Sequence, residues 1–288
     1  MRIKKHSNKN EYLLTEDGIW VRNLCKRHAK AVDLNNLCTK EDHALFLQNE
    51  FKNIKGRYAV VEQEHYDFSN LVIVSDGYDF EAKQELLCQL EGRVVVMATN
   101  GALAKWKLHE KTRETRRGIS CYVVNNPFIQ CVTYLPKHNY CPPCIAANRT
   151  NPEFLEAYRS TIYTYRTTPS RFYSGPRFEG HFYVDDYRNP ICAGIHLAYK
   201  FGVKKLLLFC CDDSFEDERP AAIQLENGLW TYPQQATGQR VIDGMLYWLR
   251  KANVQIGSHS SGINLNNATY ITDSELPEFF KEEQHDGL

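Results

Sequence analysis

Two aspartates follow a buried apolar run in the last third of the chain. Leu206 to Cys211 is uninterrupted by any polar residue, and Asp212 and Asp213 come directly after it. Such runs are typical of central strands in parallel sheets, and ligands bind at the carboxyl ends of those strands. Carboxylate oxygens are the ligands that Mg²⁺ prefers, so both residues are candidate metal ligands and Asp212 is also a candidate catalytic residue. A solvated acidic loop is the alternative.

Polar residues also follow three other strand-like runs. A glycine lets the backbone approach a ligand closely, and the N-terminus of a following helix attracts an anion such as phosphate. We therefore predict nucleotide contacts at these positions, with ordinary turn formation as the alternative. The chain contains neither a Walker motif nor G-x-G-x-x-G. The candidates are Ser75, Asp76, Gly77, Asn100, Gly101, Ser258 and His259.

The segment TTPSRFYSGPRFEGHFYVDDYRNP is rich in aromatic residues, arginine, glycine and proline. A loop of this length inside a domain is more often a binding loop than filler, although a plain surface loop is the alternative. His181 is the candidate base that deprotonates an acceptor hydroxyl, unless it is a structural histidine. Arg177, with Arg171 and Arg188 as alternatives, is the candidate that neutralises phosphate.

Two groups of residues resemble zinc ligands. Cys25, His28, Cys38 and His43 form C-x2-H-x9-C-x4-H, and NYCPPC contains a C-x2-C. The first two residues fall in a predicted helix whose packing would explain them, and two prolines between cysteines resemble neither a zinc knuckle nor a redox motif. We predict that neither group binds metal, and that the cysteines of buried segments are small apolar residues of a cytoplasmic protein.

The net charge and the hydropathy do not indicate a nucleic-acid or membrane partner, although they leave a local basic patch open. The 35 basic residues balance 35 acidic ones, so no global field attracts nucleic acid or a membrane surface. No apolar stretch reaches the roughly 20 residues of a membrane span, and the N-terminal residues lack the apolar core of a signal peptide. These features predict a cytoplasmic protein with a small-molecule nucleotide donor as partner, and they leave the acceptor open. They leave its oligomeric state open.

The order of segments predicts an α/β fold. Apolar strands alternate with helices from residue 57 to the C-terminus, which favours a Rossmann-like, doubly wound and mainly parallel sheet over residues 56–288. Right-handed crossovers then place the loops that follow the strands at one edge. Residues 1–55 are predicted to be an N-terminal helical extension without a sheet, with helices around 18–32 and 40–53.

Three segments carry a resemblance to a known family. VVVMATNGALAKW, NPICAGIHLAYKFGVKKLLLFCCDD and MLYWLRKANVQIGSHSSGINL resemble the MptE-like Rossmann superfamily over roughly residues 57–271. That group includes archaeal 6-hydroxymethylpterin diphosphokinases. It is similar in layout to bacterial CMP-sialic-acid-dependent sialyltransferases and to motility-associated flagellin glycosyltransferases. Gly202 and Asp212 match the glycine before the strand and the acidic residue at its end.

The chain also departs from that family. The family's first loop usually reads G-x-G-P-S, whereas this chain has Ser75 to Asp79, so one nucleotide contact is in doubt. Cys211 replaces the glycine before the acidic residue. Asn100 stands where sialyltransferase-like members carry an asparagine, and the resemblance implies that it contacts the nucleotide.

The residues and the resemblance together predict a nucleotide-dependent transferase. The preferred function is a glycosyltransferase with a nucleotide-sugar donor, and the enzyme would bind Mg²⁺ if its aspartates hold a metal. One alternative is an Mg-ATP-dependent diphosphokinase that acts on a hydroxymethyl group. The other is a non-catalytic nucleotide-binding or assembly module, which the loss of the first-loop glycines favours.

Overall fold

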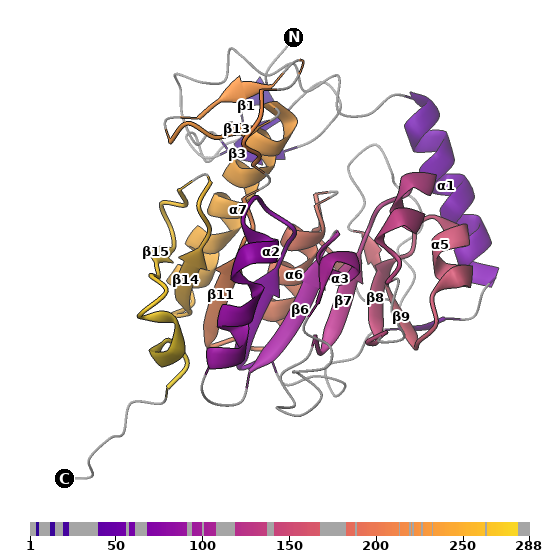
Figure 1. Cartoon of the computed structure of the whole chain (residues 1–288). Coiled ribbons are helices and arrows are strands. Elements are labelled where there is room, and N and C mark those ends of the chain that lie inside the picture. The colour runs from indigo at the N-terminus through magenta and orange to yellow at the C-terminus, as the bar shows by residue number, and fades with distance from the viewer. Residues whose placement is uncertain are drawn as a thin grey trace.

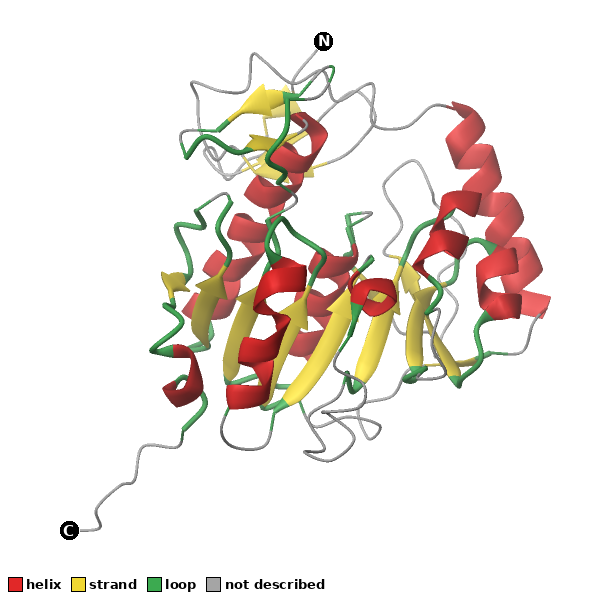
Figure 2. Cartoon of the chain, in the orientation of Figure 1, coloured by secondary structure: helices red, strands yellow, loops and turns green. Residues whose placement is uncertain are grey.

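The apolar runs of the sequence form the centre of one parallel sheet. Ten described strands belong to it, in the order β10-β9-β8-β7-β6-β5-β11-β14-β15 with β4 beside β9, and all of these pairs are parallel. The arrowheads of the central strands lie at one edge (Figure 2). The strands are β4 (Ala59–Val60), β5 (Asn70–Val74), β6 (Val95–Thr99), β7 (Cys121–Val124), β8 (Cys144–Ala147), β9 (Ile162–Thr167), β10 (Tyr183–Val184), β11 (Lys205–Phe209), β14 (Gln255–His259) and β15 (Thr269–Tyr270).

This structure is a computed structural model. It describes residues 4–5, 12–14, 20–22, 40–55, 58–60, 68–90, 94–99, 101–107, 119–136, 141–167, 183–187, 189–212, 214–218, 220, 222–225, 227–231, 233–262 and 264–281. The predicted doubly wound parallel sheet is confirmed. The order of its strands reverses between β5 and β11, because β6 to β10 continue on one side of β5 and β14 and β15 continue beyond β11 (Figure 1).

Helices cover both faces of the sheet because its strands are apolar on both faces. Leu71 and Ile73 of β5 face one apolar layer, and Val72 and Val74 face the other. The first layer includes α6 (Pro190–Lys200) and α7 (Pro233–Lys251). The second layer includes α2 (Phe80–Lys83), η3 (Gln84–Gln89), α3 (Ala102–Lys105), η4 (Ile129–Tyr134), α5 (Pro152–Ala157) and η5 (Leu276–Glu278).

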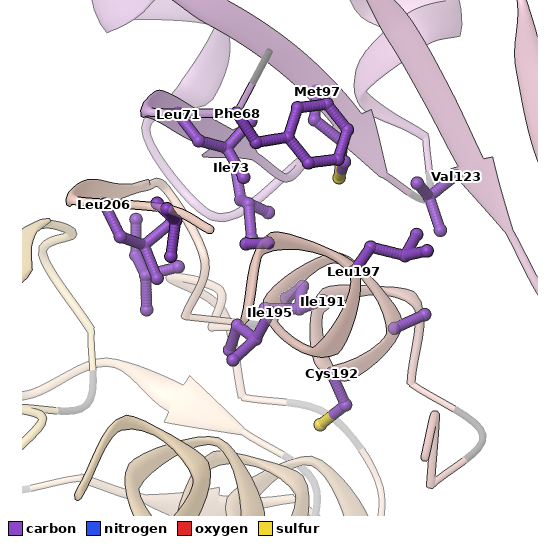
Figure 3. Packing of buried hydrophobic residues seen from close by; sticks show 14 of the residues in the cluster. Phe68, Leu71, Ile73, Met97, Val123, Ile191, Cys192, Ile195, Leu197 and Leu206 are labelled. Atoms are coloured by element: carbon purple, nitrogen blue, oxygen red, sulfur yellow. The ribbon is translucent and has the colours of Figure 1, made fainter. Parts of the chain in front are cut away.

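Helix α6 shows how the sequence sets these elements. Asn189 caps it by accepting a hydrogen bond from the backbone of Ile191, and Pro190 occupies its first turn. The helix packs on the sheet beside Ile73 (Figure 3). The packing is close, since a Cβ at Gly194 would lie 3.1 Å from Cδ1 of Ile73. The helix stops at the predicted position, since Gly202 has a φ of 76°.

Two helices of the second face are shorter than predicted. The sequence favours helices over residues 79–92 and 101–114, but α2 gives way to the 3-10 turns of η3, and α3 ends at Lys105. Trp106 adopts an extended backbone and is buried, with its ring stacked on Phe80 at 6.3 Å between centroids. Burial of that ring therefore outweighs helix propensity.

The N-terminal region corrects one prediction. Strands β1 (Lys4–Lys5), β2 (Tyr12–Leu14) and β3 (Trp20–Arg22) form an antiparallel sheet, so the predicted absence of a sheet is wrong. Residues 20–22 are a strand where a helix around 18–32 was predicted, and the rest of that range lies outside the described residues. Residues 20–22 pair in register with 12–14, and strand pairing overrides the helical spacing. The helix predicted at 40–53 is confirmed as α1 (Lys40–Lys55). The domain boundary after residue 55 stays a prediction.

Helix α1 is attached to the parallel sheet through asparagine side chains. Nδ2 of the buried Asn53 donates to the carbonyl oxygens of Asn148 at 2.8 Å and Thr150 at 2.7 Å, after β8. Nδ2 of Asn49 donates to the carbonyl of Pro127 at 2.9 Å, after β7. These bonds satisfy carbonyls at the carboxyl edge of the sheet.

None of the helices in the described part of the chain is long and apolar enough to cross a membrane.

Candidate functional site

The reversal of strand order brings two polar loops together. The backbone N–H of Ser75 donates to the carbonyl of Phe209 at 3.1 Å, and that of Gly77 donates to the carbonyl of Cys210 at 3.0 Å. In open α/β sheets ligands bind at such a point, outside the carboxyl ends of the strands. We call this region the switch-point site: Ser75–Asp79, Cys210–Asp212 and Ser260–Gly262 with Lys83 and Lys105.

Asp212 is the most enclosed acid of the switch-point site. Its side chain is fully buried, and Oδ2 accepts a hydrogen bond from Oγ of Ser214 at 3.1 Å. The carboxyl also accepts from the backbone N–H of Gly262, whereas Oδ1 has no hydrogen-bond partner. A Cβ at Gly77 would lie 2.0 Å from Oδ1, and one at Gly262 would lie 2.5 Å from Oδ2. The two glycines therefore make room for this carboxyl.

Two carboxyls of the site have opposite pKa shifts. Burial raises the pKa of Asp212, and the negative charge of Asp79 raises it further. Burial acts in the same direction on Asp79, but hydrogen bonds from Lys83 and Ser261 and the charge of Lys83 outweigh it, so the pKa of Asp79 is lowered. Asp79 is thus the charged member, and Asp212 is the acid that retains a proton to higher pH.

Lys83, Asp79 and Ser261 join the loops after β5 and β14. Nζ of Lys83 lies 2.7 Å from Oδ2 of Asp79 and 3.2 Å from Oγ of Ser261. Oγ of Ser261 donates to Oδ2 of Asp79 at 2.5 Å. The prediction from sequence did not include Lys83, and it considered Ser261 only as part of a loop that could bind phosphate or sugar. The i, i+4 spacing of Asp79 and Lys83 was the available signal for their pair.

Asp76 and Gly101 meet at the neighbouring strand. A Cβ at Gly101 would lie 2.4 Å from Oδ2 of Asp76, so this glycine also makes room for a carboxyl. Nζ of Lys105 lies 3.3 Å from the same oxygen. The structure therefore places Asp76, Gly77, Gly101 and Asp212 at neighbouring strand ends. Their predicted nucleotide contacts stay predictions.

Cys210 has a strained backbone at the centre of the site. Its φ is 51°, in the left-handed region that few residues other than glycine adopt. Its carbonyl accepts the bond from Gly77, and its Sγ lies 3.4 Å from Oδ1 of Asp79. The strained residue thus connects the segment after β11 to the loop after β5.

We expect Cys210→Gly to be more stable than Cys210→Ala by about 1 kcal/mol. The left-handed backbone conformation is unfavourable for alanine, which has a Cβ, and not for glycine. In an ordinary strand the order would be reversed, since glycine is the less stable of the two there. Chemical denaturation of both variants measures the difference. Greater stability of the alanine variant would contradict the strain.

Ser258 and His259 lie beside this site, in the packing of β14 against β15. The buried His259 ring has Nδ1 2.7 Å from the carbonyl of Ile271 and Nε2 3.3 Å from Oδ1 of Asp273. It stacks on Phe209 at 5.0 Å between centroids. The carbonyl of Ser258 accepts from the backbone of Ile271 at 2.9 Å. These contacts stabilise the packing of β14 against β15, and the predicted nucleotide contacts of both residues stay predictions.

Several residues that the sequence singles out lie outside the described part of the chain. Their assigned roles as base, phosphate ligand, nucleotide contact or metal ligand stay predictions. His43 belongs to α1, and Cys144 is buried in β8. The residues outside the described part of the chain are Cys25, His28, Cys38, Asn100, Arg171, Arg177, His181, Arg188 and Asp213.

The described residues do not form a metal site in this conformation. No three histidine, cysteine, aspartate or glutamate side chains among them gather closely enough to hold an ion. The unpartnered Oδ1 of Asp212 has the chemistry of a Mg²⁺ ligand, but it is buried against Gly77. Binding of Mg²⁺ by Asp212 therefore remains a proposal.

A second polar cluster lies at the same edge, after β8, β9 and β10. Nη2 of Arg149 donates to Oδ1 of Asp186 at 2.6 Å, and the Asp186 side chain is fully buried. Tyr165 and Thr167 donate to its Oδ2 at 3.2 and 3.1 Å. Sequence reasoning missed this cluster, because its members come from separate segments without a common motif.

Comparison with known proteins supports the fold. No family model matches the chain, and no curated protein matches it. The solved structure of the MAf glycosyltransferase from Magnetospirillum magneticum AMB-1 matches with a TM-score of 0.60 at 14% identity. The match covers 84% of this chain, which spans 41% of the length of that structure. This chain is therefore similar in fold to part of a glycosyltransferase.

Proposed function

We propose that this chain is a nucleotide-dependent transferase, and specifically a glycosyltransferase that takes a sugar from a nucleotide-sugar donor. The observation that carries the proposal is the reversal of strand order between β5 and β11, with Asp76, Gly77 and Asp212 at the carboxyl ends of those strands. Nucleotides bind at this point in many open α/β sheets. The fold likeness to a glycosyltransferase favours sugar transfer among the reactions that such a sheet can host.

Sugar transfer needs a base for the acceptor hydroxyl and positive charge beside the departing phosphate. His181 remains the candidate base and Arg177 a candidate phosphate ligand. Within the described residues, Asp212 offers a buried acceptor atom without a partner, the kind of group that a ligand donor can satisfy. We assign to Asp212 the role of orienting the donor.

A panel of nucleotides tests this proposal. CMP, UDP, GDP and ATP, each with and without Mg²⁺, are added to the protein while its melting temperature is measured. A ligand at about 100 times its Kd stabilises the folded state by about 2.7 kcal/mol, so the correct nucleotide raises the melting temperature. We expect CMP, UDP or GDP to do so, and the matching nucleotide-sugar to be hydrolysed or transferred.

The other outcomes separate the alternatives. Stabilisation by ATP with Mg²⁺ alone favours the diphosphokinase. Stabilisation by a nucleotide without turnover of any donor favours a non-catalytic binding module. A melting temperature that none of the nucleotides changes would contradict nucleotide binding altogether.

A further inference from the structure

We propose that Lys105 binds the phosphate groups of the nucleotide and that Asp76 holds this lysine at the switch point in the ligand-free protein. The inference rests on the proposed function, because it names the group that would receive the phosphates. Lys105 is held less tightly than Lys83, the other lysine of the switch-point site, and the neighbouring acids other than Asp76 already have partners.

The two lysines are held differently. Nζ of Lys83 has two close partners, at 2.7 and 3.2 Å, and its side chain is 24% exposed beside an Asp79 that is 10% exposed. Nζ of Lys105 lies 3.3 Å from Oδ2 of Asp76 and 3.5 Å from its carbonyl, and the Lys105 side chain is 42% exposed. Lys83 therefore closes a tight internal contact, whereas Lys105 has a longer and more accessible pair.

An accessible ion pair of this kind can be exchanged for a ligand. Exposed lysine–carboxylate pairs contribute little to stability, because solvent screens them. A phosphate oxygen offers Lys105 a stronger charge-assisted hydrogen bond than a solvated carboxylate does. When phosphate replaces Asp76 as the partner of Lys105, the new interaction is therefore more favourable in free energy than the ion pair that is lost. Before binding, Asp76 keeps Lys105 near the position where the phosphate binds.

The other acids nearby have partners of their own. Asp79 is paired with Lys83, and Glu81 is hydrogen-bonded to Lys107. The hydrogen bond from Lys107 is the main cause that lowers the pKa of Glu81, and the charge of Lys105 lowers that pKa further. The pKa of Asp212 is raised, so this carboxyl retains its proton to higher pH than an ordinary aspartate. Asp76 is thus the acid that directly competes with a phosphate for Lys105.

The position of Lys105 fits a ligand at the ends of β5 and β6. It lies in the turn that begins at Gly101, since its backbone N–H donates to the Gly101 carbonyl at 3.1 Å. Gly101 in turn packs against the carboxyl of Asp76, two residues after β5. The lysine therefore reaches back to the carboxyl edge at which nucleotides bind in this class of sheet.

Binding of inorganic pyrophosphate and of UDP, measured calorimetrically in EDTA, tests the inference. Lys105→Met keeps the aliphatic stem and is expected to weaken binding of both probes by about 10-fold or more, as expected for loss of a charged hydrogen bond. Asp76→Asn is expected to tighten it by about 3-fold, because the competitor for Lys105 loses its charge. Lys107→Met, a neighbouring exposed lysine on the same segment, is the matched control and should bind like the wild type.

Opposite effects of the two variants distinguish phosphate binding from a structural role, which would make both variants bind more weakly. Lys105→Arg keeps the charge and should restore binding if Lys105→Met is unstable. Wild-type affinity in Lys105→Met, or weaker binding in Asp76→Asn, would overturn the inference while leaving nucleotide binding intact. If the wild type binds neither probe and no other nucleotide of the panel, the inference and the proposed function both fail.

Discussion

Asp212→Asn is expected to reduce turnover by about 100-fold or more while the protein stays folded. The two side chains have nearly the same shape, but asparagine carries no charge and replaces one carboxyl oxygen with an amide nitrogen. Loss of one preorganised electrostatic contact typically lowers turnover by about 100- to 1,000-fold. Steady-state turnover of the nucleotide-sugar identified by the panel, together with the melting temperature of the same sample, measures both effects.

The pH dependence of stability gives an independent readout. The pKa of Asp212 is raised in the folded protein, so the folded state binds this proton more tightly than the unfolded state does. The stability linked to that proton is complete below the unfolded pKa and is lost as the pH rises through the folded pKa. Asp212→Asn has no such proton, so it should be at least as stable as the wild type at pH 7. This advantage should shrink as the pH falls.

Asp217→Asn is the matched control, because Asp217 lies in the same loop but is exposed. It should keep wild-type turnover. The competing explanation is that Asp212 only fixes the turn at Ser214 and the loop at Gly262. Asparagine would then lower stability by about 1 kcal/mol, as loss of a capping bond does, and leave turnover nearly unchanged. That result would remove Asp212 from the mechanism.

The sequence predicted the sheet because its central strands satisfy local and global preferences together. α6 has a capping asparagine, a proline in its first turn and a left-handed glycine after its end, and β11 follows as an apolar run. Each of these signals is local, so each can be recognised without the rest of the fold. The positions of Asp76 and Asp212 at one edge then follow from parallel strands and right-handed crossovers.

Other elements depend on contacts that no local pattern encodes. β8 contains only Cys144 to Ala147, and so short an apolar run does not distinguish strand from helix. α3 ends early because Trp106 is buried against Phe80, which belongs to a different helix, α2. β3 forms because residues 12–14 provide a partner strand.

The same limit applies to the site. The sequence predicts that Gly77 and Gly101 make room for a ligand, but both glycines, and Gly262 as well, pack against carboxyls of the protein itself. The hydrogen bond from Ser261 to Asp79 joins residues 182 positions apart. Spacing can predict that loops share an edge, whereas it cannot predict which side chains pair there.

Gly77→Ala is expected to destabilise the protein by about 3 kcal/mol and to abolish nucleotide binding. The new Cβ would lie 2.0 Å from Oδ1 of Asp212 and 2.4 Å from the carbonyl oxygen of Cys210. The second of these atoms belongs to the backbone, so rotation of a side chain cannot relieve the clash. Forced overpacking costs about 1–3 kcal/mol, and the upper end applies when backbone must move.

Thermal melting and the nucleotide panel measure both effects. For a chain of this size the expected drop is about 6 to 12 °C, from roughly 2–4 °C for each kcal/mol. Gly238→Ala is the matched control: its Cβ would lie 3.4 Å from Nδ2 of Asn189, an ordinary contact, and it lies inside α7. That variant should gain about 0.5–1 kcal/mol from helix propensity.

The contrast between the two alanines locates the functional role of Gly77. If Gly77→Ala melts like the wild type and still binds the nucleotide, the close packing of the loop after β5 on Asp212 is not required for the site. If the variant has a lower melting temperature and fails to bind the nucleotide even well below that temperature, the geometry of the loop itself is needed for binding. We expect the second result if a nucleotide binds at the switch point. Displacement of Gly77 would move both the loop after β5, which carries Asp76, and the carboxyl of Asp212 against which Gly77 packs.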